Sequence, residues 1–215
     1  MSYAVMRLQK IKNSGALGKH IDRSSDGSIS IPENASPITV ANNIHWDKNG
    51  KSYTQNEWTL FSQANPLSKR INDEIKERYS LDKKIRKDAV KAVEYIMTSD
   101  HYKMNEIFKK PEVYSQWVKD NKAFLASIYG EENIISMHLH LDEQTPHMHA
   151  IVVPITDDGR LSCKSFVDGK RDLAEQQTQY SKLMEKYGMH RGQEGSTARH
   201  QKVNSNYKIY TRDRA

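Results

Sequence analysis

The sequence predicts an α+β protein with an antiparallel β-sheet and helices packed on it. The first observation is a pair of apolar, alternating segments, 134–141 and 147–154, joined only by residues 142–146, which is a connection typical of a β-hairpin. The second is that strand-like and helix-like segments follow one another in the order β, α, β, α, β, β, α. Helices placed between such strands bury their apolar sides on the sheet.

The remaining strands are expected where short runs are apolar and β-capable, at 3–8, 44–46 and 89–97. Residues 16–23 form either a short helix or a loop. Residues 24–37 are rich in Ser, Asp, Gly, Asn and Pro, so an exposed loop is expected there.

The longer helices are marked by residues that start, break or end a helix. The pattern over 55–79 is helical with a break near Pro66, which has no amide hydrogen to donate. A helix over 111–129 begins with proline at a favoured first position and stops before glycine. Residues 171–187 form a polar helix that ends before Gly188.

The composition excludes several classes of protein. The chain has 215 residues, enough for one large or two small domains with a buried core. Its mean hydropathy is −0.83, and no stretch approaches the ~20 apolar residues of a membrane span. The N-terminus lacks the apolar region of a signal peptide. A single cysteine, Cys163, excludes an intramolecular disulfide and a Cys-rich zinc module. We therefore expect a cytoplasmic protein.

The distribution of charge suggests two kinds of ligand. The net charge is +6, but residues 131–159 contain six acidic and no basic residues, whereas residues 160–215 contain twelve basic and six acidic ones. Basic flanks favour a polyanion such as nucleic acid, and residues 191–215 are expected to form a basic tail. The acidic segment is also rich in histidine, which favours a bound cation.

Four of the nine histidines lie in the predicted hairpin, spaced by two on each strand. Side chains alternate between the faces of a strand, so His138 shares a face with His140, and His147 shares one with His149. Three imidazoles on adjacent strands can bind one divalent ion and leave coordination positions open. His140 is level with the second pair, whereas His138 lies about 7 Å farther along. The alternative is a polar sheet face with no ligand.

The hairpin segment HLDEQTPHMHAIVVP resembles the metal-binding motif of the Mob/Pre family, the MobV relaxases that mobilise plasmids. The opening SYAVMRLQKIK and the following GALGKHIDR are similar to the N-terminal motif of that family, which has a histidine after the first strand. The segments IRKDAVKAVEYIMTSD, GRLSCKSF and RGQEGSTARHQKV are weaker likenesses. Together they extend over about residues 1–205. One departure is that residues 34–46 lack the arginine of the family's Asn-Pro…Arg…His-x-Asn pattern.

The resemblance implies an HUH-endonuclease fold, a two-layer or three-layer sandwich, with residues 1–215 forming a single relaxase domain at the N-terminal part of a longer protein. It implies a domain that nicks one strand of a plasmid transfer origin and becomes joined to the 5′ phosphate. The metal ligands would be His140, His147 and His149, holding Mn or Mg, with Zn, Co or Ni also possible. Glu143 would be an acid–base group or would support the ligands, and His20 would be the nucleophile.

A histidine nucleophile is chemically reasonable because neutral imidazole has a lone pair at pH 7, whereas the pKa of tyrosine is about 10. Glu143 is expected to hold the other ring nitrogen of His20. The rival nucleophiles are Tyr3, Tyr207 and Tyr210.

The expected partner is DNA, as an origin hairpin and the single strand around the nick, with no membrane contact and with possible dimerisation through a region after residue 215. Basic side chains near the predicted site or in the tail are the expected contacts. They are Arg7, Lys10, Lys12, Arg23, Arg86, Lys87, Lys164, Arg191, Arg199 and Lys202.

Three other functions use the same hairpin. A rolling-circle replication initiator is also an HUH nuclease but attacks with tyrosine. A zinc hydrolase unrelated to DNA would be expected to carry an HExxH helix, which the sequence lacks. A DNA-binding module with a structural metal would bind the origin without nicking it.

Overall fold

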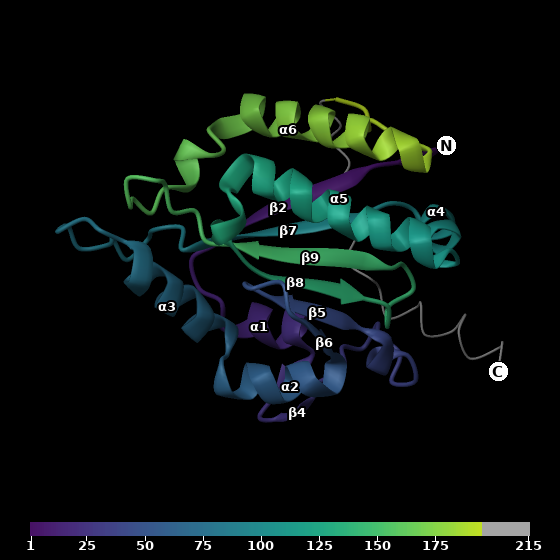
Figure 1. Ribbon diagram of the computed structural model, residues 1–215, viewed down its shortest axis with the longest axis horizontal. Coiled ribbons are helices and arrows are strands. Elements are labelled where there is room, and N and C mark those ends of the chain that lie inside the picture. Colours follow the sequence, from purple (N-terminus) through teal and green to yellow (C-terminus); the bar gives the residue numbers. More distant parts are fainter. Residues whose placement is uncertain (195–215) are drawn as a thin grey trace.

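The middle layer of the protein is a six-stranded antiparallel sheet. The computed structural model describes residues 1–194, and Figure 1 shows the sheet between two layers of helices. Its strands, in spatial order, are β2 (Val5–Ile11), β7 (Ala92–Thr98), β9 (His147–Val152), β8 (Ile134–His140), β5 (Ile44–Asp47) and β6 (Ser52–Thr54). The predicted α+β class is confirmed, and the arrangement has three layers.

Helices cover both faces of the sheet (Figure 1). One face carries α4 (His101–Phe108), α5 (Pro111–Tyr129) and α6 (Gly169–Met184), and the other carries α1 (Gly15–Asp22), α2 (Gln55–Ala64) and α3 (Leu67–Arg78). The expected break at Pro66 separates α2 from α3, and α5 has the predicted bounds. None of the helices in residues 1–194 is long and apolar enough to cross a membrane.

Alternation along β8 and β9 separates an apolar face from a histidine face. Leu139, Met148 and Ala150 are fully buried in the core beneath α4, α5 and α6. Burial of a side chain as large as Leu139 contributes about 1.5–3 kcal/mol. His140 and His149 project from the opposite face, where α1 lies. A shift of one residue in strand register would exchange the two faces, so the apolar core also fixes where the histidines point.

Several short elements differ from the sequence-based prediction. The expected loop over 24–37 contains a hairpin, β3 (Ser24–Ser25) and β4 (Ser28–Ile29). Its turn is Asp26-Gly27, with φ of 52° and 80°, the conformation that a two-residue hairpin turn requires. The helix α4, the strand β6, and the two-residue strands β1 (Ser2–Tyr3) and β10 (Met189–His190) were also not predicted, because such short segments give little periodicity.

The loop between β8 and β9, residues 141–146, lies at one end of the sheet, which we call the hairpin end. The Thr98 hydroxyl at the end of β7 donates a hydrogen bond of 2.8 Å to the Pro146 carbonyl oxygen. His101 Nδ1, at the start of α4, donates one of 2.6 Å to the Gln144 carbonyl oxygen. These contacts hold the loop against β7 and α4, so its position at the hairpin end is fixed.

Candidate metal centre and nucleophile

Three histidines at the hairpin end each have one ring nitrogen held by the protein. His140 Nε2 donates to the Ile21 carbonyl oxygen over 2.9 Å, and His147 Nδ1 donates to the Thr145 carbonyl oxygen over 2.9 Å. His149 Nδ1 lies 2.7 Å from Glu94 Oε1. A proton on each of these nitrogens leaves the lone pair on the other nitrogen of the ring, which is the arrangement found in metal-ligating histidines.

The free ring nitrogens are close together and two of them are buried. His140 Nδ1 and His149 Nε2 have no hydrogen-bond partner among residues 1–194. The ligand atoms of His140, Glu143 and His147 all lie within 4.8 Å of one another, as do those of His20, His140 and His149. A buried polar atom without a partner is costly, and a bound cation removes that cost. The residues present therefore fit a divalent metal ion.

The chemistry of the donors narrows the choice of ion. Three imidazoles and a nearby carboxylate suit Mn, Zn, Co or Ni, whereas Mg prefers oxygen ligands. Burial, followed by the neighbouring histidines and Arg23, lowers the pKa of His140 and His149 well below the ordinary value. These rings are therefore neutral at pH 7 and keep the lone pair that a metal needs.

Glu94 is a site residue that sequence reasoning missed. Its carboxylate and the His149 ring are both 2% exposed, and their hydrogen bond fixes the orientation of the ring. Burial raises the pKa of Glu94 to about 7. The available signal was a single acidic residue in the otherwise apolar strand AVEYIMT, since an acid is seldom buried in a central strand without a partner.

The expected nucleophile lies beside the candidate metal ligands. His20 is in the last turn of α1, and its ring centre is 5.5 Å from that of His149 and 5.9 Å from that of His140. Burial and then the positive charge of Arg23 lower the pKa of His20, so its ring is neutral at pH 7. The fold thus brings together a residue of the N-terminal motif and the hairpin.

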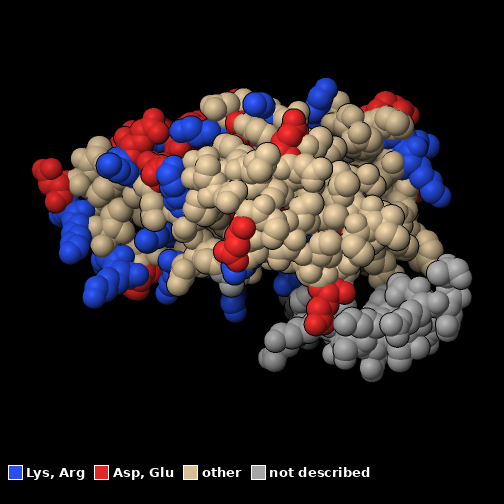
Figure 2. Space-filling view, turned by 90° about the horizontal axis from the view of Figure 1, so that it is seen from below, with Lys and Arg blue, Asp and Glu red and all other residues tan. Residues whose placement is uncertain are grey.

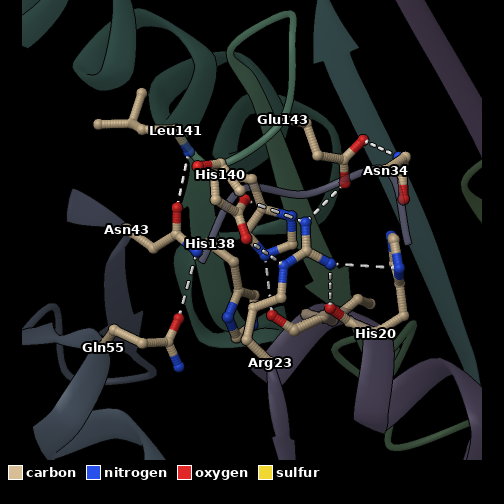
Figure 3. Close-up of polar contacts among 12 residues, drawn as sticks. His20, Arg23, Asn34, Asn43, Gln55, His138, His140, Leu141 and Glu143 are labelled. Atoms are coloured by element: carbon tan, nitrogen blue, oxygen red, sulfur yellow. Dashed lines mark hydrogen bonds and ion pairs between the residues drawn. The ribbon is translucent and has the colours of Figure 1, made fainter. Parts of the chain in front are cut away.

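Glu143 is held by residues other than His20 (Figure 3). Its Oε1 accepts a hydrogen bond of 2.6 Å from Arg23, and its Oε2 accepts one of 2.6 Å from Asn34. Oε1 also lies 3.8 Å from His147 Nε2. Among residues 1–194, no hydrogen bond joins Glu143 to His20, in contrast to the expected contact, because Arg23 lies between them. Glu143 is better placed to act beside the metal ligands.

Arg23 is fully buried and is therefore not the surface DNA contact that the sequence suggested. Its guanidinium contacts His20, Asp142 and Glu143. A solvated arginine was the natural interpretation of GKHIDR, because the acidic partners come more than a hundred residues later in the chain.

His138 belongs to a separate buried polar group. Its Nδ1 lies 2.8 Å from His45 Nδ1 and its Nε2 lies 2.9 Å from Ser136 Oγ, so both of its ring nitrogens are engaged. His45 stacks on Trp58 of α2 with ring centres 5.2 Å apart. This group packs α2 against the histidine face and is separate from the candidate metal ligands at the hairpin end.

Comparison with known proteins agrees with this geometry. A family model described as plasmid recombination enzyme (Mob_Pre) matches residues 1–208. The chain belongs to the plasmid recombination enzyme family. Its relatives include plasmid recombination enzyme type 3 of Staphylococcus aureus, which is 33% identical over 220 residues, covering 98% of this chain and 48% of the relative. The plasmid recombination enzyme of Streptococcus agalactiae is 34% identical over 209 residues, covering 94% and 38%. The chain thus spans about half the length, or less, of these curated relatives.

Solved structures with this fold include the MobM relaxase domain (MOBV; Mob_Pre) bound to plasmid pMV158 oriT DNA, in Mn-bound crystals. One such structure has a TM-score of 0.77 at 30% identity and covers 96% of this chain and 99% of that one. A second, at pH 6.8, has a TM-score of 0.75 at 30% identity and covers 99% and 100%. The Mn in these relatives agrees with the donor set of this family member.

The other basic residues expected to contact DNA are spread over the surface. Arg7 is exposed and lies in register with Ile96, which is in register with His149. Lys10 and Lys12 lie at or just beyond the far end of β2, and Arg86 and Lys87 lie in the segment before β7 at the same end of the sheet. Seen from below, Lys and Arg side chains gather at this end, on the left of Figure 2. This far end lies about 20 Å from the hairpin end, because β2 has 7 residues and a strand rises about 3.3 Å per residue.

Two of the C-terminal residues that were expected to contact DNA, Lys164 and Arg191, lie in the part of the chain that the structure describes. Lys164 is exposed, and its Nζ lies 3.6 Å from Asp168 Oδ2. Arg191 donates to Thr178 Oγ1 and to the Ala174 carbonyl oxygen of α6, so its guanidinium anchors the end of the described chain. Arg199, Lys202, Tyr207 and Tyr210 lie outside the described residues, as does nearly all of the expected basic tail.

Proposed function

We propose that this domain nicks one strand of DNA at a plasmid transfer origin and becomes joined through His20 to the 5′ phosphate. The observation that carries the proposal is the convergence of three imidazoles, whose ring centres lie 4.7–5.2 Å apart, beside a fourth imidazole on α1. In a structural metal site, protein ligands fill every coordination position. Three protein ligands with an open position, beside a nucleophile, are typical of a catalytic site. The family and the DNA-bound relatives support the same function.

His140, His147 and His149 would hold the ion, and Glu143 lies within reach as a further ligand. A bound divalent ion would polarise the scissile phosphate and offset the charge that develops during transfer. The task of the protein is to keep the three rings oriented, which it does through Glu94 and two backbone carbonyls.

His20 would attack phosphorus with its unprotonated ring nitrogen. A nitrogen–phosphorus bond forms, the bond between phosphorus and the 3′ oxygen breaks, and the 3′ oxygen takes a proton. The neutral ring requires no strong base, and its low pKa keeps it neutral below pH 7. The negative charge of Glu143 near His20 offsets the positive charge that the ring acquires.

The DNA strand would cross the open part of the sheet next to His149. Here β7 is an interior strand, yet Ile96 is partly exposed, and on the neighbouring β2 both Arg7 and Gln9 are exposed. An apolar side chain beside a cation fits a base and a phosphate of single-stranded DNA. The basic residues at the far end of the sheet, including Arg86, would contact DNA away from the nick.

The deciding experiment is incubation of the domain with Mn²⁺ and supercoiled DNA that carries a transfer origin, followed by mass spectrometry of protein–DNA adducts. The proposal predicts relaxed DNA and a peptide modified at His20. A modified tyrosine would instead identify a rolling-circle initiator, and binding with no nicking under any divalent ion would identify a non-catalytic module. Action on plasmid DNA keeps the bacterial cytoplasm as the predicted location.

A further inference from the structure

Two large non-polar side chains project from the surface at the hairpin end. Tyr102 is 85% exposed and Ile38 is 88% exposed, and among the described residues only the N-terminal Met1 exposes a large non-polar side chain more fully. Single side chains of this kind are ordinary on a protein surface. These two, however, lie on segments that are hydrogen-bonded to the same loop, residues 141–146. Their shared position beside the candidate metal centre points to a ligand that accepts non-polar contacts.

Ile38 belongs to a segment that packs on the first half of this loop. The Ser36 amide donates a hydrogen bond of 2.7 Å to the Asp142 carbonyl oxygen, and Ala35 forms a β-bridge with Glu143. The Ile38 amide donates a hydrogen bond of 3.2 Å to the Ser36 hydroxyl, which turns the backbone just before Ile38. Because Glu143 is in a group that could hold a metal ion, the exposed Ile38 is anchored next to the candidate metal centre.

Tyr102 is held on the second half of the same loop, where α4 begins (Figure 1). His101 Nδ1 donates a hydrogen bond of 2.6 Å to the carbonyl oxygen of Gln144, the residue after Glu143. The rings of His101 and Tyr102 meet edge to face, with centres 5.7 Å apart. The anchored His101 ring therefore supports the Tyr102 ring, most of which is open to a flat partner.

The end of α4 adds positive charge to the surface around Tyr102. Lys103 is paired with Glu106 over 2.7 Å, whereas Lys109 and Lys110 are exposed and form no ion pair within residues 1–194. Seven residues are close to two helical turns, so Lys109 follows Tyr102 on the same face, about 10 Å farther along the helix axis. An exposed aromatic ring with lysines beside it is typical of surfaces that bind single-stranded nucleic acid.

We propose that Tyr102 and Ile38 contact bases of single-stranded DNA at the two halves of the hairpin loop, Tyr102 by stacking and Ile38 by non-polar contact, while Lys109 binds phosphate. This inference rests on the proposed function, because it places bases of the strand that is nicked. Paired bases in a duplex are stacked on one another, so only an unpaired strand offers a base to the ring. An isologous contact with a second copy of the chain would bring the lysines of both copies together, which their like charges oppose.

The test compares the binding of two oligonucleotides of equal length and charge. One is an oligothymidylate of twelve residues, and the other has the same sugar–phosphate chain without bases. Stacking on an aromatic ring tolerates any sequence, so oligothymidylate is a suitable probe, and it carries no origin that could be nicked. In fluorescence anisotropy, we expect the wild type to bind oligothymidylate more tightly than the abasic strand. Tyr102→Ala should weaken oligothymidylate binding about tenfold and leave abasic binding unchanged.

Three further variants separate the ring from its hydroxyl and from the nearby charge. Tyr102→Phe should bind both strands as the wild type does, because stacking needs the ring and not the hydroxyl. Ile38→Ala should weaken oligothymidylate binding about threefold, since an aliphatic side chain covers less of a base than a ring does. Lys109→Ala should weaken the binding of both strands equally and reduce the salt slope of log Kd by about 1.

Leu60→Ala is the matched control. Leu60 is 69% exposed, but it lies on α2, and within residues 1–194 no hydrogen bond joins α2 to residues 141–146. This variant should bind both strands as the wild type does.

Equal or undetectable binding of the two strands by the wild type would overturn the proposal, as would equal losses in Tyr102→Ala and Leu60→Ala. A Tyr102→Phe variant as weak as Tyr102→Ala would also overturn it, since the hydroxyl would then be the contact. If Tyr102→Ala kept its affinity for oligothymidylate but lost a dimer that light scattering detects in the wild type, the surface would be a contact between copies. Absence of an adduct with origin DNA would count against the proposed function alone, because these binding measurements require no nicking.

Discussion

Replacement of Glu94 by glutamine tests the support of the metal ligands most directly. Glutamine has the shape of glutamate, so its carbonyl oxygen can still accept the hydrogen bond from His149 Nδ1, but the negative charge is lost. Removal of such a supporting group typically weakens metal binding by about 10- to 100-fold, which is about 1.4–2.7 kcal/mol. We expect the dissociation constant for Mn²⁺ in Glu94→Gln to rise by that factor.

The same substitution should have the opposite effect in the metal-free protein. Burial raises the pKa of Glu94 to about 7, above its value in the unfolded chain. The folded protein therefore holds a proton that the unfolded chain releases between about pH 4.5 and 7, so this group makes the protein less stable as pH rises through that range. Glutamine resembles the protonated acid and is not subject to this loss. Without metal, Glu94→Gln should be at least as stable as the wild type at pH 8.

The assay is calorimetric titration with Mn²⁺ together with thermal unfolding at fixed metal concentration. An ion at 100 times its dissociation constant stabilises the wild type by about 2.7 kcal/mol, whereas in the variant the gain falls to about 0.4–1.4 kcal/mol. For a domain of this size, the metal-induced rise in Tm should drop from roughly 5–11 °C to roughly 1–6 °C.

Glu74→Gln is the control for removal of a buried carboxylate. Glu74 lies on α3, away from the hairpin end, and is 5% exposed. It forms ion pairs with Lys48 and with Arg78 of the same helix. This variant should lose stability but bind Mn²⁺ normally. Unchanged Mn²⁺ affinity in Glu94→Gln, or a similar fall in affinity in both variants, would refute the role given to Glu94.

Three further predictions concern the ligands, the nucleophile and the DNA path. His147→Ala removes one of the three ring nitrogens proposed to hold the ion, so Mn²⁺ affinity in calorimetry should fall at least 100-fold, more than in a supporting-group variant; an unchanged titration would remove the hairpin from the site. His20→Ala should abolish the covalent adduct on denaturing gels while origin binding stays nearly intact, and an adduct that persists would place the nucleophile elsewhere. Arg7→Ala should weaken binding of single-stranded DNA and reduce the salt slope of log Kd by about 1. Lys12→Ala, at the opposite end of β2, should leave adduct formation unchanged. If both substitutions changed adduct formation equally, the proposed DNA path beside His149 would be wrong.

Much of the fold followed from local sequence patterns. The helix break at Pro66 and the bounds of α5 at Pro111 and Gly130 were predictable because these residues restrict their own backbone. The alternation of apolar and histidine residues in the hairpin set its two faces, since side chains two residues apart share a face of a strand. The Asp26-Gly27 turn had a local signal of the same kind, but its strands are only two residues long.

The contacts that complete the site depended on the tertiary structure. His149 meets Glu94 from 55 residues away, Glu143 meets Asn34 across 109 residues, and Arg23 meets Asp142 across 119. A sequence pattern reports which side chains share a strand face or a helix face, but it does not report which element packs against that face. The sequence alone therefore determined that this protein presents a cluster of imidazoles, and the packing of β7 and α1 against the hairpin decided which ring nitrogens remain free to bind an ion.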